Sequence, residues 1–284
     1  MRFSFKTSPQ NTTWADMLAV WKAADEIEVF ESGWTFDHFY PIFSDPTGPC
    51  LEGWTTLTAL AQATTRLRLG TLVTGIHHRH PAVLANMAAT LDVISGGRLE
   101  LGIGAGWNEE ESDAYGIELG SIRERLDRLE EACQVLIGLL SQETTDFHGR
   151  YYRLTQARNE PKGPQRPHPP ICIGANGERR TLRITAKYAQ HWNFPGGSPA
   201  EFARKRDVLA AHCADVGRDP KEILLSAHIR LADGNYRRVI EDAIALGAEG
   251  LDLAIVYLPL PHDPRVVDAL AERIRDSGLW REGT

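Results

Sequence analysis

Side chains suited to chemistry gather in a few short stretches, each at the end of an apolar run. Asp37-His38 carries a carboxylate and a histidine. The other stretches hold aromatic, amide, glycine and small residues, and they are Thr74-Gly75-Ile76, Trp107-Asn108, Gly174-Ala175-Asn176-Gly177 and Trp192-Asn193-Phe194. These stretches contain no pair of carboxylates of the kind used in general acid and base catalysis. Their composition suits a flat, conjugated cofactor more than a sugar or a metal ion.

His38 is the candidate for proton transfer, because an imidazole changes its charge near neutral pH. Side chains alternate across a strand, so Asp37 and His38 do not share a face while both lie within one. Just past the strand end, either side chain can turn inward. The alternative is that His38 only caps a loop.

Two clusters of ionisable residues look like sites but are expected to be structural. The histidines at positions 77, 78 and 80 directly precede a proline that starts a helix, and they lack the spacing and carboxylate support of metal ligands. We therefore expect no metal site. Residues 109–111 are three glutamates, which we interpret as the solvent-exposed start of a short helix, where negative charge complements the helix dipole.

The stretch from Gly174 to Gly177 leads into a predicted helix over residues 178–188. Free backbone N–H groups and the positive end of the helix dipole form an anion site at such a junction, suited to a phosphate. The alternative is an ordinary turn that needs glycine.

Two of the stretches, Thr74-Gly75-Ile76 and Trp107-Asn108, are positioned by a strand–helix–strand unit over residues 68–106. Pro81 suits the first turn of its helix, and Gly96-Gly97 suits the end. Two strands joined through a packed helix run parallel with a right-handed crossover. In the second strand Gly102, Gly104 and Gly106 leave one face nearly bare, which we interpret as clearance for a ligand; the alternative is a tightly packed barrel interior. The spacing of GIGAG does not fit a dinucleotide-binding fingerprint.

The same alternation of strand and helix continues along the whole chain. Eight strands are predicted, over residues 2–7, 28–36, 68–75, 98–106, 171–174, 190–194, 223–231 and 251–258. An eight-fold alternation of this kind favours a TIM (β/α)8 barrel, with its site at the carboxyl ends of the strands. We expect one domain over residues 1–284. Residues 144–170 interrupt the pattern with a hairpin and a proline-rich loop, and we interpret this insertion as a lid over the site.

Composition excludes several other classes of function. The 284 residues carry a net charge of −7, which argues against nucleic acid or an anionic membrane as the main partner. No apolar run is long enough to span a bilayer, and the first residues lack a signal-peptide core. The four cysteines are scattered, as expected of reduced residues in a cytoplasmic protein.

Several segments together resemble a known family. They are DHFYP at 37–41, LGTLVTGIHHRHPAVLA at 69–85, DVISGGRLELGIGAGWNEEE at 92–111, RLDRLEEACQVL at 125–136, HGRYY at 148–152 and IGANGERRTLRITAKYAQHWN at 173–193. With them the chain resembles the luciferase-like monooxygenase superfamily, and within it the deazaflavin (coenzyme F420)-dependent oxidoreductases. The resemblance implies a barrel, usually dimeric, that binds a flavin or deazaflavin.

The resemblance also implies roles for individual residues. His38 matches a histidine near the reactive ring carbon, and Asp37 belongs to the same strand end. A non-proline cis peptide is implied around Thr74-Gly75-Ile76, behind the ring. Trp107 and Asn108 match contacts to the ring or its side chain, and the stretch from Gly174 to Gly177 matches the phosphate site. Trp107 replaces a glutamate that acts as an acid in the sugar-phosphate dehydrogenases of the family, so their substrate is not expected here.

The resulting prediction is an oxidoreductase that moves a hydride between coenzyme F420 and a small organic substrate. The alternative cofactor is reduced FMN, with oxygen, in a monooxygenase. A second alternative is a barrel that binds flavin without catalysis. We expect a homodimer, and we expect neither metal, membrane nor nucleic acid as a partner.

Overall fold

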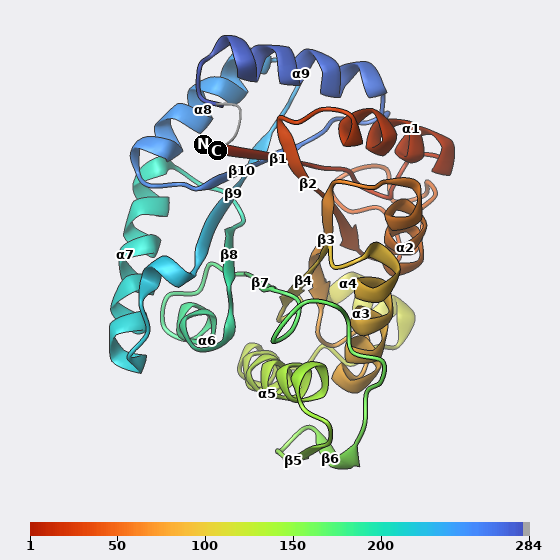
Figure 1. Ribbon diagram of the computed structural model, residues 1–284, viewed down its shortest axis with the longest axis vertical. Coiled ribbons are helices and arrows are strands. Elements are labelled where there is room, and N and C mark those ends of the chain that lie inside the picture. The colour runs from red at the N-terminus through yellow and green to blue at the C-terminus, as the bar shows by residue number, and fades with distance from the viewer. Residues whose placement is uncertain (281–284) are drawn as a thin grey trace.

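The protein folds as a closed barrel of parallel strands surrounded by helices (Figure 1). A computed structural model describes residues 1–280. Around the barrel the strand order is β1-β10-β9-β8-β7-β4-β3-β2. The barrel strands are β1 (Arg2–Lys6), β2 (Phe30–Asp37), β3 (Arg68–Gly75), β4 (Leu99–Gly104), β7 (Ile171–Gly174), β8 (His191–Phe194), β9 (Leu224–Arg230) and β10 (Leu253–Tyr257). The predicted TIM barrel is confirmed.

Helices follow the barrel strands and cover the outside. They are α1 (Trp14–Asp25), α2 (Gly53–Ala63), α3 (Pro81–Ser95), α4 (Glu109–Tyr115), α5 (Ile122–Ser141), α6 (Thr181–Tyr188), α7 (Pro199–Val216), α8 (Tyr236–Ala248) and α9 (Pro264–Asp276), with a short 3-10 turn at Pro220–Glu222. Local sequence explains their ends: α3 begins at Pro81 and ends at Gly96, which has the left-handed φ of 68° that glycine tolerates. Ser121 and Glu124 form a capping box at the start of α5.

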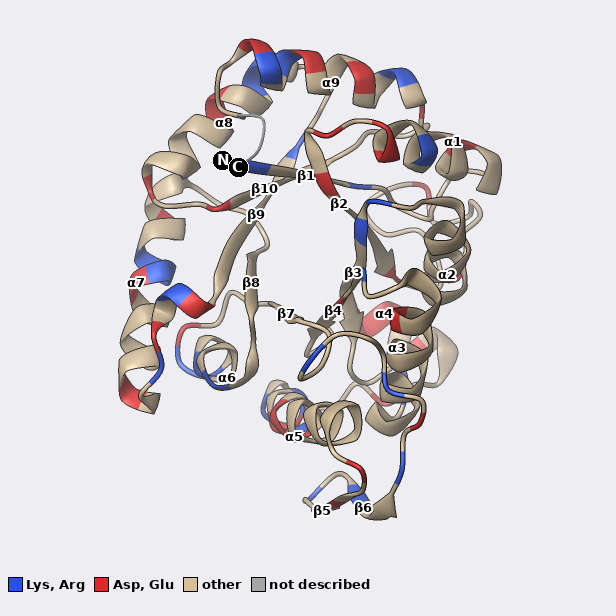
Figure 2. Cartoon of the chain, in the orientation of Figure 1, with Lys and Arg blue, Asp and Glu red and all other residues tan. Residues whose placement is uncertain are grey.

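Alternating side chains divide the core into two parts. Outward-facing residues such as Phe3 and Leu101 pack against the helices. Inward-facing residues fill the barrel interior, and its apolar part consists of Trp34, Leu72, Cys172, Leu253 and Ile255. Figure 2 shows charges of both signs interspersed along the outer helices α5, α7, α8 and α9. In the described part of the chain, no helix is both long enough and apolar enough to cross a membrane.

Strand β3 contains a bulge near its carboxyl end. Gly70 pairs with Glu100 and Thr74 with Ile103 on β4. Between these two pairs β3 contains one residue more than β4, which makes a β-bulge. A non-proline cis peptide bond lies within this bulge, between Leu72 and Val73. The position expected from the resemblance, around Thr74-Gly75-Ile76, is therefore wrong by about two residues.

The bulge explains the bare glycine face of β4. A Cβ atom on Gly104 would lie 2.7 Å from Cγ2 of Val73, and one on Gly102 would collide with the carbonyl oxygen of Thr71. The glycines of β4 thus make room for the backbone and side chain of the neighbouring strand. Val73 covers only Gly104, because Gly102 faces the carbonyl of Thr71 and a Cβ atom on Gly106 would meet the ring of His77. Gly104 and Gly106 also line the cavity at this end of the barrel, so clearance for a ligand, the interpretation favoured from the sequence, stays a prediction.

The insertion over residues 144–170 contains the predicted hairpin, formed by β5 (Thr145–His148) and β6 (Arg153–Ala157). The proline-rich loop that follows packs near the starts of β3 and β4: Gln165 bonds to Asp92, to the carbonyl of Leu99 and to Arg68. These contacts lie at the opposite end of the barrel from the carboxyl ends of the strands. The expectation that this segment forms a lid over the site is wrong.

Candidate active site

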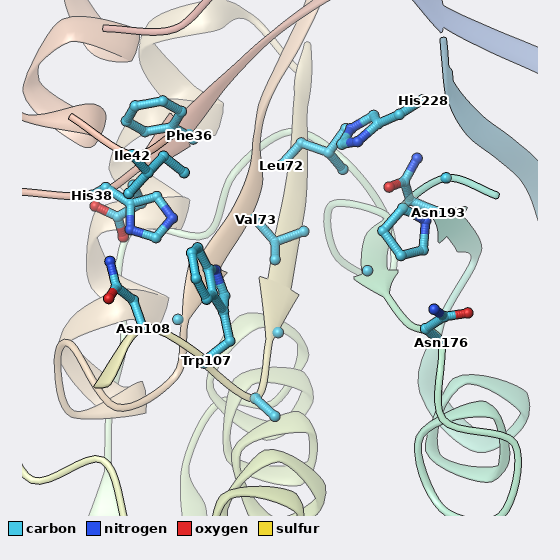
Figure 3. A pocket seen from close by; sticks show the side chains of 18 of the residues that line it. Phe36, His38, Ile42, Leu72, Val73, Trp107, Asn108, Asn176, Asn193 and His228 are labelled. Carbon is cyan, nitrogen blue, oxygen red and sulfur yellow. The ribbon is translucent and has the colours of Figure 1, made fainter. Parts of the chain in front are cut away.

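A cavity of about 820 Å³ opens at the carboxyl ends of the barrel strands. Figure 3 shows His38, Trp107 and Asn108 on one side of it, Val73 in the middle, and His228, Asn193 and Asn176 on the other side. Most of the residues predicted for the site line this cavity, and they are Asp37, His38, Gly75, Trp107, Asn108, Gly174 and Asn176.

Four residues predicted to bind a cofactor lie elsewhere. Thr74 is fully buried and accepts a hydrogen bond of 2.9 Å from the indole of Trp54. Ile76 and Ala175 are buried in the core between barrel and helices. Gly177 is exposed in the turn before α6 and does not line the cavity. These four residues support neighbouring lining residues by packing or by turning the chain.

His38 is paired with a buried carboxylate. Its Nδ1 lies 2.7 Å from Oε2 of Glu111, whose other oxygen accepts a 2.6 Å hydrogen bond from the backbone N–H of Phe39. Burial alone would raise the pKa of Glu111, but the hydrogen bond and charge of His38 and the hydrogen bond from the backbone N–H of Phe39 lower it. The glutamate is therefore ionised at neutral pH and is only 1% exposed. The interpretation of residues 109–111 as entirely solvent-exposed is wrong for Glu111.

This pairing determines which nitrogen of His38 faces the cavity. An ionised carboxylate only accepts hydrogen bonds, so Nδ1 of His38 must donate its proton to Glu111. Nε2 has no hydrogen-bond partner among residues 1–280, and the ring lines the cavity. When the imidazole is neutral, Nε2 is a proton acceptor that opens onto the cavity.

Asp37 is held in an ion pair, which leaves it little freedom to contact a ligand. Arg79 donates to both of its oxygens, the longer contact being 3.1 Å. Burial alone would raise the pKa of Asp37, but His78 and Arg79 hold it well below its usual range. His78 lies between the two acids, 3.7 Å from Asp37 and 3.8 Å from Glu111. Asp37 thus fixes the loop that carries the neighbouring histidines.

His77 is a packing residue at the edge of the cavity. A Cβ atom on Gly75 would lie 2.6 Å from its ring, so the glycine is needed for this close approach. Its Nε2 lies 3.3 Å from the hydroxyl of Ser112, and burial lowers the pKa of His77 to about 4. The imidazole is therefore neutral at pH 7. No cluster of histidine, cysteine and carboxylate side chains suited to a metal occurs within residues 1–280.

Trp107 and Asn108 follow β4 and have different roles. The oxygen of the Asn108 side chain caps α4 by accepting from the backbone N–H of Glu111, at 3.2 Å. Trp107 is 50% exposed and stacks on Phe43, with ring centroids 5.4 Å apart and planes 4° apart. Its indole also meets the ring of His38 edge-on at 5.7 Å. These aromatic rings border the cavity mouth beside the candidate proton acceptor.

The amino end of α6 fits an anion. The helix begins at Thr181, three residues later than predicted, and no side chain caps its first N–H groups. Asn176 and Thr181 line the cavity beside it, and the ammonium of Lys205 donates to the carbonyl of Asn176 at 2.7 Å. The N–H of Leu182 is bonded to the carbonyl of Gly177, and Lys205 also lies 3.5 Å from Glu178. The helix dipole and the remaining N–H groups of the first turn still favour a phosphate here.

Sequence reasoning missed two groups of lining residues. A sequence signal for Glu111 did exist. With Asn108 as the N-cap, Glu111 is the third helical residue, and a glutamate at that position turns back toward the cap. The second group lies at the ends of β1, β9 and β10: Lys6, His228, Arg230 and Tyr257. The strand RFSFK alternates, so the lysine shares a face with Ser4, which lies inside the barrel.

Comparison with known proteins identifies a family and relatives with similar sequences. The family profile described as luciferase-like monooxygenase matches residues 1–260. The chain is 37% identical over 174 residues to the pyrimidine monooxygenase RutA of Methylobacterium radiotolerans, covering 59% of this chain and 44% of that protein. It is 32% identical over 208 residues to the F420-dependent hydroxymycolic acid dehydrogenase of Mycobacterium tuberculosis, covering 72% and 56%. The chain thus spans about half the length of these curated relatives.

A solved structure shares the whole fold. An F420-dependent secondary alcohol dehydrogenase in complex with an F420-acetone adduct superposes with a TM-score of 0.85 at 19% identity, over 97% of this chain and 98% of the other. At this level of identity the likeness concerns the fold.

Proposed function

The chain belongs to the luciferase-like monooxygenase family, and from this membership we propose that it is a coenzyme F420-dependent oxidoreductase acting on a small organic substrate. The observation that carries the proposal is His38, whose Nε2 opens onto the cavity while Glu111 holds Nδ1 at 2.7 Å. A hydride transfer to or from an alcohol or carbonyl also moves one proton, which needs such a group.

The cavity fits a flat ring system and a phosphate. Val73 lies in the middle of the cavity wall and is flanked by lining residues with little or no side chain, which are Gly75, Gly104, Ala105, Gly106 and Gly174. These residues would hold the ring against the β3 bulge, and the amino end of α6 would hold a phosphate. When bound, the deazaflavin supplies or accepts the hydride.

The remaining chemistry falls to the protein. In the direction of alcohol oxidation, Nε2 of His38 takes the proton that the substrate hydroxyl loses as its C–H bond gives up a hydride. Glu111 stabilises the positive charge that then develops on the imidazole. In carbonyl reduction the same nitrogen returns the proton.

The second candidate is a monooxygenase that uses reduced FMN and oxygen, and the identity of 37% to RutA favours it. A third candidate, a barrel that binds flavin without catalysis, leaves the His38–Glu111 pair unexplained. We also propose that the protein is a homodimer and that its substrate is a small molecule.

Cofactor titration separates these candidates. We expect fluorescence titration of the purified protein to give a dissociation constant at least about tenfold lower for F420 than for FMN. Tighter binding of FMN, with oxygen consumption in the presence of a flavin reductase, would favour the monooxygenase. His38→Ala should retain cofactor binding and lose turnover of an identified substrate; retained turnover would contradict the role of His38.

A further inference from the structure

The wall of the cavity formed by β1, β10 and β9 carries two basic side chains, Lys6 and Arg230. Lys6 pairs with Tyr257 on β10, and Tyr257 pairs with Arg230 on β9, so the three residues stand at one level of the barrel. Residues paired in neighbouring parallel strands point to the same face, which here is the cavity. His228, two residues before Arg230, shares that face and lies across Val73 from His38 in Figure 3.

Neither cation has a carboxylate partner among residues 1–280. The Lys6 ammonium donates to the carbonyl oxygen of Leu72 at 2.8 Å and lies 5.1 Å from the centre of the Tyr257 ring. The Arg230 guanidinium lies 5.4 Å from the same ring. Burial, and then the charge of Arg230, lower the pKa of Lys6 to about 7. With that pKa the Lys6 amine is only about half protonated at neutral pH, and an anion bound beside it would favour the charged ammonium form.

His228 adds to this wall a polar atom whose hydrogen-bonding capacity is not satisfied within the described residues. Its Nε2 is buried and has no hydrogen-bond partner in the described part of the chain. Burial lowers the pKa of His228 well below its usual value, and the charges of Lys6 and Arg230 act in the same direction. The ring is therefore neutral. Buried polar atoms are normally satisfied, so this one marks a place for a ligand atom.

The other charges that line the cavity are already balanced. Asp37 is paired with Arg79, and Glu111 is hydrogen-bonded to His38. Within the described residues, the lining cations without an acidic partner are thus both on the β1–β10–β9 wall. An incoming anion would meet positive charge on this wall and negative charge on the side of Glu111.

We propose that Lys6, His228 and Arg230 form a subsite for the carboxylate of an acidic substrate. The inference rests on the proposed function in taking this cavity as the place where substrate and cofactor meet. The ammonium and guanidinium would contact the carboxylate oxygens, and a neutral His228 would donate one further hydrogen bond. An oxyanion on the cofactor ring has the same chemistry, so the test separates these two sources.

Benzoate and benzamide test the subsite, because they match in shape and differ in charge. We expect calorimetry on the purified protein, with and without cofactor, to give benzoate an affinity about tenfold or more above that of benzamide, since hydrogen bonds to charged groups are the stronger ones. Lys6→Met and Arg230→Met should each reduce that ratio toward one. Arg273→Met, which removes a charge from α9 outside the cavity, should leave it unchanged.

Two outcomes would overturn the subsite, which are equal affinities in the wild type and a benzoate ratio retained in both variants. In the second case the variants can also lose F420 or FMN affinity. The last result would assign the two charges to the cofactor. Lys6 donates a hydrogen bond to the β3 bulge, so Lys6→Met could fail to fold. Arg230 makes no such bond, and Arg230→Met therefore keeps the test valid in that case. If neither cofactor binds but the charge-dependent preference for benzoate remains, the proposed function fails and the subsite stands.

Discussion

Replacing Glu111 by glutamine tests the proton-handling pair with little change in shape. The glutamine oxygen can still accept from the N–H of Phe39, now 2.6 Å from Oε1 of Glu111. Its amide group then faces Nδ1 of His38 and donates, so Nδ1 becomes the acceptor and the ring proton moves to Nε2. In Glu111→Gln the nitrogen that opens onto the cavity therefore carries a proton and no longer accepts one from the substrate.

The size of the effect follows from the bond that is lost. A hydrogen bond to a charged partner contributes about 1.5–3 kcal/mol, and each 1.36 kcal/mol changes a rate by about tenfold. The unfavourable tautomer adds to that loss, and a positioned acid or base contributes about 10²–10⁴-fold in all. We expect kcat/KM for alcohol oxidation to fall by about 10²-fold or more, with cofactor affinity unchanged.

Two assays report this change. Steady-state kinetics with an alcohol found by screening gives kcat/KM, and nitrogen NMR of histidine-labelled protein shows which ring nitrogen of His38 carries the proton. Glu110→Gln is the matched control, because Glu110 is the exposed neighbour of Glu111 in the first turn of α4. It should behave as the wild type in both assays.

The double variant His38→Ala/Glu111→Gln decides whether the two residues act together. If Glu111 acts through His38, the double variant is no slower than His38→Ala alone. Losses that multiply would refute the reasoning, and so would an unchanged tautomer with an unchanged rate in Glu111→Gln.

Three further predictions concern the barrel interior and the anion site. Burial alone would raise the pKa of Glu100, but His191 and Arg68 lower it to about 2. Its contribution to stability is thus complete above the unfolded value of about 4.3 and is lost as the pH falls toward 2. Glu100→Gln should cost about 3 kcal/mol of unfolding free energy at pH 7, and urea titrations should show this difference shrinking below about pH 4; a constant difference would contradict it. Gly102→Ala should destabilise by about 1–3 kcal/mol, because its Cβ would collide with a carbonyl of the β3 bulge; a wild-type melting temperature would argue against that packing. Asn176→Ala should weaken a phosphate-bearing cofactor several-fold and leave its dephosphorylated form unaffected, as measured by fluorescence titration.

The sequence was sufficient for the barrel because each strand and helix has its own local signal. Pro81 and Gly96 bound α3, and the alternation of strands and helices leaves few other closed architectures. It also placed His38 at the cavity, since strand ends form the site of such a barrel. Helix starts were less well determined: α6 begins three residues late because the turn before it takes up residues 178–180.

Features that depend on how two strands fit together could not be predicted. The glycines on one face of β4 can be recognised from the sequence. What packs against them depends on one extra residue in β3, and no local sequence pattern predicts that Val73 points over Gly104. The sequence favours a lid for the proline-rich loop, because long loops in compact domains are often lids. Its position is decided by Gln165, whose partners are distant in sequence.

The cavity is polarised, and this limits the substrates it accepts. His38, which is hydrogen-bonded to Glu111, lies on one side of Val73 in Figure 3, and His228 lies on the other. Lys6 and Arg230 belong to the same β1–β10–β9 wall as His228. An acidic group near Glu111 would face a buried carboxylate, which costs free energy unless it is protonated. A substrate held through its carboxylate at Arg230 must therefore place the carbon that reacts at a distance from that carboxylate, across Val73. A screen should accordingly favour acids whose alcohol or ketone is remote from the carboxylate over 2-hydroxy or 2-oxo acids.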